Sequence, residues 1–117
     1  MMMHYAKIAA ERVYRQDGIE VELVDLRTLV PLDRETVINS FKKTGKALIV
    51  YEDNQFLGYG AEIASILSDE AFEYMDAPIK RLAGPDVPGV PFSHPLQEAF
   101  MINPDKIADA IRDLASY

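Results

Sequence analysis

The sequence contains no cysteine among its 117 residues. Disulfide bonds and thiolate metal sites are therefore excluded, and a cytoplasmic protein is favoured. A chain of this length suits a single domain, which buries roughly 65% of the surface of its unfolded chain and so forms a core without covalent cross-links.

Basic residues are outnumbered as well. The chain has 12 lysines and arginines against 19 acidic residues, which gives a formal net charge of −7. Nucleic acids and anionic membranes both require a basic footprint, so we predict neither as a partner. A basic protein would be attracted mainly through a faster association rate, although the same charge also serves solubility alone.

Long apolar runs are also missing. No stretch approaches the roughly 20 apolar residues that cross a bilayer. The start, MMMHYAKIAAERVY, lacks the basic-then-apolar order of a secretory signal, so no export signal is predicted.

Helical periodicity is present in four segments. Asp33 and Asn103 are suited to begin helices, Pro104 to the first helical position, and Gly18 and Gly45 to end them. The predicted helices are 2–15, 32–45, 61–75 and 103–117, with a short helical turn at 95–100. The residues expected to face inward are Tyr5, Ile8, Ala9, Val13, Val37, Ile38, Phe41, Ala61, Ala64, Leu67, Ala71, Phe72, Met75, Ile107, Ile111 and Leu114.

Strands are predicted between these helices, at 19–26, 46–52 and 77–84. The apolar run at 46–52 is typical of an interior parallel strand. Alternating strands and helices predict an α/β fold of three layers, helix–sheet–helix, with a mostly parallel sheet and right-handed crossovers. Three strands are few for this many helices, so we expect a further strand directly before residue 1 in a longer protein; an architecture without that strand is the alternative.

Two glycines, Gly58 and Gly60, stand in the segment GYGAE at the start of a predicted helix. Free N–H groups and the helix dipole can hold phosphate at such a place. The segment lacks the third glycine of a dinucleotide motif and the Lys-Ser/Thr of a P-loop, and Glu62 would repel an anion. Close packing of helix against strand is favoured, with a stand-alone phosphate- or nucleotide-binding module as the alternative.

The segment YEDN, residues 51–54, follows a strand at the edge where open α/β sheets bind ligands. Glu52 and Asp53 would point to opposite faces, so a pair sharing one proton is not expected. We favour capping of the next loop by side-chain to backbone bonds of Asp53 and Asn54.

The two histidines, His4 and His94, lie far apart in the sequence. His94 follows Ser93, but neighbours in sequence seldom present both side chains to one atom, so no catalytic triad is predicted. Without clustered carboxylates, two distant histidines also make a poor metal site. We favour a loop or interface role for His94 over proton chemistry, and the residues alone predict no catalytic, cofactor-binding or metal-binding residue.

The segment GPDVPGVPFSHP, residues 84–95, holds four of the seven prolines. Proline fixes its own φ and favours an extended residue before it, so the segment is predicted to be stiff. Its apolar residues Val87, Val90 and Phe92 suggest a brace laid along the domain that presents a packing face to another subunit. An ordinary stiff loop is the alternative, and Asp86 is expected to bond its own nearby backbone.

Three blocks of the chain resemble the C-terminal domain of transketolase-like thiamine enzymes. They are DLRTLVPLD, GYGAEIA and APIKRLAGPDVPGVPFSHPLQEAF, in this order, and the similarity covers nearly the whole chain. In particular, they resemble the beta subunit of the decarboxylating component of 2-oxo-acid dehydrogenase complexes, a group with pyruvate, branched-chain 2-oxo acid and acetoin members.

This resemblance implies a transketolase C-terminal-like domain over residues 1–117, with one antiparallel edge strand and a first strand ahead of the opening helix. It also implies a fragment that lacks the N-terminal pyrimidine-binding domain. Thiamine diphosphate and magnesium would bind in the parent enzyme, between the alpha subunit and that missing domain. The fragment alone is therefore expected to be inactive.

The resemblance further implies a non-catalytic assembly role. The domain would pack against a second beta subunit in an α2β2 assembly and dock the basic subunit-binding domain of the acyltransferase core. Asp109, Asp113 and the carboxylate of Tyr117 are assigned to that docking contact by their position near the end of the chain.

Overall fold

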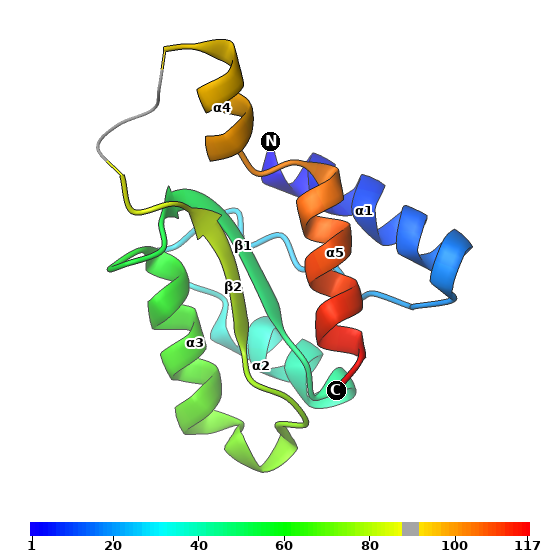
Figure 1. Cartoon of the computed structure of the whole chain (residues 1–117). Coiled ribbons are helices and arrows are strands. Elements are labelled where there is room, and N and C mark those ends of the chain that lie inside the picture. Colours follow the sequence, from blue (N-terminus) through cyan, green and yellow to red (C-terminus); the bar gives the residue numbers. More distant parts are fainter. Residues whose placement is uncertain (88–91) are drawn as a thin grey trace.

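Two parallel strands, β1 (Leu48–Asn54) and β2 (Lys80–Gly84), form the sheet of the computed structural model, which describes residues 1–87 and 92–117 (Figure 1). Leu48 lies opposite Lys80 and Val50 opposite Leu82, and the register shifts before Asn54 meets Gly84. Both strands were predicted, and the parallel pairing confirms the expected α/β fold class.

Helices cover both faces of this sheet. Helices α1 (Met2–Asp17) and α5 (Pro104–Ala115) pack on one face, and α2 (Arg34–Thr44) and α3 (Tyr59–Glu70) pack on the other (Figure 1). The remaining elements are a single 3₁₀ turn, η1 (Phe72–Tyr74), and the short helix α4 (His94–Phe100). No helix in the described ranges is both long and apolar enough to cross a bilayer.

The core consists of two apolar clusters separated by the sheet. Alternation along β1 directs Leu48 and Val50 toward the α1/α5 cluster and Ile49 toward the α2/α3 cluster. The α1/α5 cluster is built on Val13 and Ile107, each almost fully buried. The inward positions predicted for α5 are confirmed, whereas Ile8 of α1 stays exposed.

The predicted helix caps are confirmed. Asp33 accepts a hydrogen bond from the backbone N–H of Thr36 at 3.1 Å, and Asn103 accepts one from Lys106 at 2.9 Å. Gly18 and Gly45 end α1 and α2 with φ of 68° and 69°, in the left-handed region that glycine adopts without a Cβ clash. These local signals therefore position three of the four main helices.

Acid is expected to weaken the start of α2. Hydrogen bonds from the Thr36 side chain and backbone hold the pKa of Asp33 below its ordinary value of 3.8. A pKa lowered by folding contributes stability that is complete above the unfolded value and is lost as the pH falls below it. Thermal melts followed by circular dichroism at pH 7, 5 and 3 should show a steeper loss between pH 5 and 3 for the wild type than for Asp33→Asn.

The matched control for this experiment is Glu35→Gln, which removes one charge from the same first turn of α2. It should keep the wild-type loss of melting temperature below pH 5. If Asp33→Asn and Glu35→Gln follow the same pH profile, the Asp33 cap is not the source of the acid sensitivity.

The prediction of a strand at 19–26 is wrong, because this segment joins no ladder among the described residues. The segment is neither helix nor strand, and its side chains reach both clusters, with Val21 against the α1/α5 cluster and Leu26 against the α2/α3 cluster. Within the described residues, however, the only ladder joins β1 and β2. Alternation alone fixes the side-chain directions of a strand, but a ladder also requires a neighbouring backbone.

The predicted helix at 61–75 also differs. It begins at Tyr59 and ends at Glu70, and Ala71 breaks it before η1. The last turn carries Asp69 and Glu70 with no basic residue, which is unfavourable at the negative end of a helix dipole. The break leaves Phe72 exposed, and Ile63 and Ile66 fill the core positions instead.

Candidate functional site

The aromatic ring of Tyr51 packs against two glycines, Gly58 and Gly60, at the start of α3. We call these two glycines the glycine corner. Gly58 and Gly60 are both buried, and a Cβ added at Gly58 would lie 2.5 Å from Cε2 of Tyr51. A Cβ added at Gly60 would lie 2.6 Å from Cζ of the same ring. The glycines therefore let helix and strand pack closely, as the favoured interpretation predicted.

Hydrogen bonds hold this ring in place. The Tyr51 hydroxyl accepts from Arg81 at 3.1 Å, and Arg81 also donates to the carbonyl of Gln55 at 2.6 Å. The Tyr51 ring thus packs directly against both glycines, as close packing of helix against strand requires. A phosphate- or nucleotide-binding role for Gly58 and Gly60 is accordingly disfavoured.

The end of β1 is organised by side-chain to backbone bonds. Asp53 accepts from the N–H of Asn54 at 2.8 Å, in agreement with the predicted capping. Within the described ranges, Asp86 bonds a distant residue and not its own neighbours as expected: it accepts from the N–H of Phe56 at 2.9 Å, across 30 residues. Glu52 and Asp53 are exposed, and the structure shows no acid–base pair between them.

The histidines lie on the surface, in separate helices. His94 is the first residue of α4 and lies 3.1 Å from Glu98, one turn further along, with both side chains largely exposed. His4 is an exposed residue of α1. The described residues contain no cluster of three or more side chains suited to hold a metal ion.

Large apolar side chains are exposed in two loops that meet beside α3. Val30 is 90% exposed, Phe56 72% and Leu57 86%. The hydroxyl of Tyr59 donates to the carbonyl of Leu29 at 2.8 Å and so joins the loop around Val30 to the start of α3. We call these exposed residues (Leu29, Val30, Phe56 and Leu57) the apolar end. Exposed apolar side chains on neighbouring loops are typical of protein contacts.

The proline-rich segment is described only in part, because residues 88–91, which include Val90, lie outside the described residues. Val87, directly before the residues that are not described, is 44% exposed, and Phe92, directly after them, is completely exposed. The Phe92 ring is therefore available to another surface. The expectation that the segment forms a brace along the domain stays a prediction.

The three residues predicted to dock a partner all lie on the surface, Asp109 in the middle of α5 and Asp113 and Tyr117 at its end. Two of them converge on Lys80: Asp113 lies 3.2 Å from its ammonium group, and the ring of Tyr117 lies 5.7 Å from it. Lys46 donates to the main-chain oxygen of Tyr117 at 2.8 Å. Sequence reasoning missed Lys46 and Lys80, since no local pattern indicates which side chains the fold brings to the end of α5.

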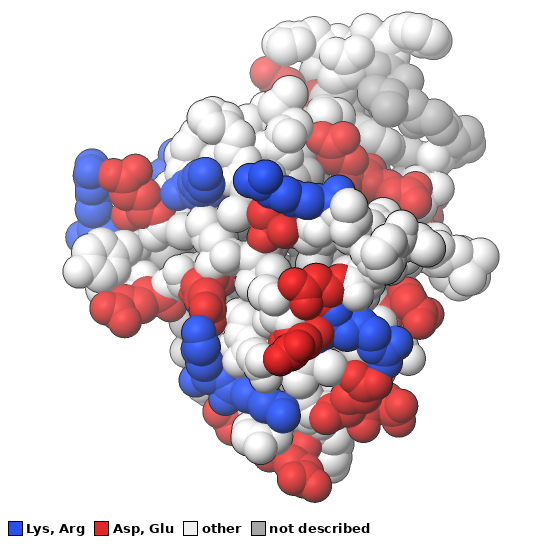
Figure 2. Space-filling model, turned by 180° about the vertical axis from the view of Figure 1, so that it is seen from behind, with Lys and Arg blue, Asp and Glu red and all other residues white. Residues whose placement is uncertain are grey.

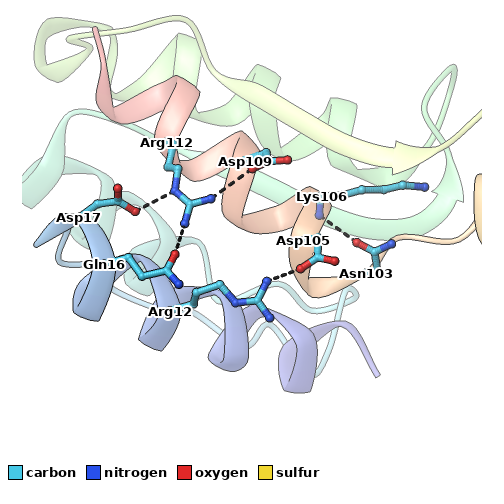
Figure 3. Close-up of polar contacts among 8 residues, drawn as sticks. All are labelled: Arg12, Gln16, Asp17, Asn103, Asp105, Lys106, Asp109 and Arg112. Atoms are coloured by element: carbon cyan, nitrogen blue, oxygen red, sulfur yellow. Dashed lines mark hydrogen bonds and ion pairs between the residues drawn. The ribbon is translucent and has the colours of Figure 1, made fainter.

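Asp109 takes no part in the Lys80 contacts of Asp113 and Tyr117. It belongs to a group of hydrogen bonds and ion pairs between α1 and α5, which we call the seam (Figure 3). Arg112 donates to Asp109 at 3.2 Å, to Asp17 at 2.7 Å and to Gln16 at 2.7 Å. The hydrogen bond to Asp17 is the main cause that raises the pKa of Arg112 above its ordinary value. A second ion pair, Arg12 with Asp105, extends the seam.

Charges of both signs are scattered over the face drawn in Figure 2, with acidic side chains beside basic ones. On this face the acidic side chains therefore do not gather into one large patch.

The sequence of this three-layer α/β domain matches a model of a known protein family. The family model described as transketolase, C-terminal domain, matches residues 1–107. The chain belongs to this family.

Its relatives include beta subunits of 2-oxo-acid dehydrogenases, as the sequence blocks indicated. The 2-oxoisovalerate dehydrogenase subunit beta of Bacillus subtilis (strain 168) is 46% identical over 117 residues, which is 100% of this chain and 36% of that protein. The pyruvate dehydrogenase E1 component subunit beta of Rickettsia felis is 43% identical over 108 residues, which is 92% of this chain and 33% of that protein.

A solved structure has a similar fold. A protein described as a split gene transketolase, inactive beta4 tetramer, superposes with a TM-score of 0.80 at 26% identity, over 98% of this chain and 35% of that chain. The chain thus spans about a third of the length of its curated relatives.

Proposed function

We propose that this chain is the non-catalytic assembly domain of a 2-oxo-acid dehydrogenase beta subunit. The 46% identity to such a subunit along the entire chain carries the proposal. In this role the domain packs against a second beta subunit and the alpha subunit, and it docks the subunit-binding domain of the acyltransferase.

The surface of the domain supports the packing part of this proposal. The apolar end exposes Val30, Phe56 and Leu57 in two loops that Tyr59 ties together. Exposed apolar residues on ordered loops lose little conformational entropy when another surface covers them, so they suit a permanent subunit contact.

Thiamine diphosphate and magnesium are proposed to bind elsewhere in the parent enzyme. Among the described residues, the two glycines at the start of α3 pack against the ring of Tyr51, and the acids form no group suited to a metal. These residues do not fit the cofactor, and we assign no catalytic step to them. Titration of the 117-residue chain with thiamine diphosphate in a calorimeter should give no saturable heat.

Docking of the acyltransferase is proposed to use Asp109, Asp113 and the Tyr117 terminus. All three are exposed, Asp109 in the middle of α5 and Asp113 and Tyr117 at its end. Their neighbouring cations Arg112 and Lys80 already pair with them, so a basic partner must replace these intramolecular ion pairs. The net charge of −7 attracts a basic partner, and salt screens this attraction, so the contact should weaken as salt rises.

The double variant Asp109→Asn/Asp113→Asn is expected to weaken this docking about tenfold, because two attractive charges are lost. The measurement is calorimetric titration of the chain with the purified subunit-binding domain of a 2-oxoisovalerate dehydrogenase acyltransferase, at 50 and 300 mM salt. Saturable binding that weakens at 300 mM salt is the expected wild-type result.

The matched control is Asp69→Asn/Glu73→Gln, which removes two exposed acids from the α3 side of the domain. It should bind like the wild type. If both double variants weaken binding equally, the loss comes from the change in net charge and not from a specific docking site at Asp109 and Asp113. If the wild type does not bind at all, the docking proposal is wrong.

A further inference from the structure

Two residues with strained backbones lie in the loops of the apolar end. Among the described residues, Arg27 and Leu57 are the only ones other than glycine with a positive φ, at 54° and 60°. They lie in the two loops that the hydrogen bond from Tyr59 to Leu29 joins. The left-handed conformation is unfavourable for a residue with a Cβ, and such strain is concentrated at functional sites.

Leu57 is unfavourable for a second reason. It is 86% exposed and belongs to neither apolar cluster of the core. Glycine or asparagine would adopt the same backbone conformation with less strain and would expose no large apolar side chain. The core of the domain therefore does not account for leucine at this position, whereas a partner that covers the side chain would.

The loop between β1 and α3 is also held in one conformation. It lies at the end of the sheet to which both strand arrows point (Figure 1). The N–H of Gln55 donates to the carbonyl of Gly84 at 3.1 Å, and the carbonyl of Gln55 accepts from Arg81 at 2.6 Å. The N–H of Phe56 donates to Asp86 at 2.9 Å. A loop fixed in this way loses little conformational entropy when it binds.

Acidic side chains accompany the exposed apolar residues. Glu52 and Asp53 are exposed in the last residues of β1, and Asp86 is exposed directly after β2. Arg27, an exposed cation of the other loop, already pairs with Asp25 at 3.3 Å. A two-fold contact between copies of this chain would bring the same acidic surface together twice, and like charges in a contact are unfavourable. Charge complementarity therefore favours a different polypeptide with basic residues.

We propose that Leu57 is the anchor residue by which the apolar end binds a different polypeptide, one that presents an apolar pocket with lysine or arginine at its rim. This inference rests on the proposed function, in which that polypeptide is the alpha subunit. The side chain of Leu57 enters the pocket, and the other residues of the apolar end keep water away from the contact.

Leu57→Asn is expected to change stability and binding in opposite directions. Asparagine tolerates the left-handed backbone better than leucine, so the melting temperature of the 117-residue chain should rise by roughly 3–6 °C. Calorimetric titration with the purified alpha subunit of a 2-oxoisovalerate dehydrogenase should show binding at least about tenfold weaker than that of the wild type. A leucine that served only the fold would give a lower melting temperature when replaced.

The matched control is Leu96→Asn, which replaces an exposed leucine of α4. It should bind like the wild type and should not raise the melting temperature. Leu57→Met keeps an apolar side chain and should bind within a few-fold of the wild type. Equal weakening by Leu57→Asn and Leu96→Asn, or unchanged binding by Leu57→Asn, would overturn the proposal.

Two further outcomes concern the partner. If the wild type forms dimers in sedimentation experiments and Leu57→Asn abolishes them while the alpha subunit does not bind, the occupant is a second copy and the proposal is wrong. If the wild type binds the subunit-binding domain of the acyltransferase but not the alpha subunit, this inference fails alone. If it binds neither, the proposed function fails with it.

Discussion

Replacement of Gly60 by alanine is expected to lower the melting temperature of the domain by roughly 10–20 °C, the result of overpacking worth about 3 kcal/mol. The new methyl group would overlap the Tyr51 ring, with Cζ at 2.6 Å and Cδ1 at 2.7 Å. The ring cannot turn aside without breaking its 3.1 Å hydrogen bond from Arg81. Differential scanning calorimetry measures the shift directly.

Two further variants separate this overlap from the general cost of losing a glycine. Gly18→Ala lies in open space at φ 68°, so it carries only left-handed strain, about 1 kcal/mol. Tyr51→Ala removes the ring, and the double variant Tyr51→Ala/Gly60→Ala should be more stable than the sum of the single effects predicts. If the losses of stability of the two single variants simply add in the double variant, the Tyr51 ring is not the reason that position 60 requires glycine.

The second large effect is expected in the core. Leu67→Ala and Ile107→Ala should each cost about 2–5 kcal/mol, because both side chains are almost fully buried, at 2% and 1% exposure. The two residues belong to different clusters, on opposite faces of the sheet. Urea denaturation followed by circular dichroism is the measurement.

Their combination tests whether the two clusters are independent. Additive costs of about 4–10 kcal/mol would approach the whole stability of an ordinary domain, so the double variant should be largely unfolded at 25 °C. Leu96→Ala, at an exposed position of α4, is the control and should change little. A double variant markedly more stable than the sum would show that β1 couples the two faces.

Local chemistry predicted much of this fold from the sequence. The caps at Asp33 and Asn103, and the glycines at the ends of α1 and α2, act within one turn of chain, and each was found where expected. The apolar stripe of α5 also follows directly from helical spacing. These features depend on near neighbours, which the sequence shows.

Features that depend on distant partners were harder to predict. Residues 19–26 alternate like a strand but have no ladder partner in the described chain. Asp86 bonds Phe56 across 30 residues, and Lys80 reaches Asp113 across 33. An aromatic residue at the end of a strand, followed by two nearby glycines, is the one local signal that could have indicated the closed corner around Tyr51.

The seam between α1 and α5 has a consequence for the order of folding during synthesis. Asp17 and Arg112 are 95 positions apart, and α5 supplies Ile107 and Ile111 to the cluster over Leu48 and Val50. This cluster cannot close until the ribosome has released residues 104–115. Until then the α1/α5 face of the sheet lacks the apolar cover of α5, and a chaperone that binds apolar surface can shield it.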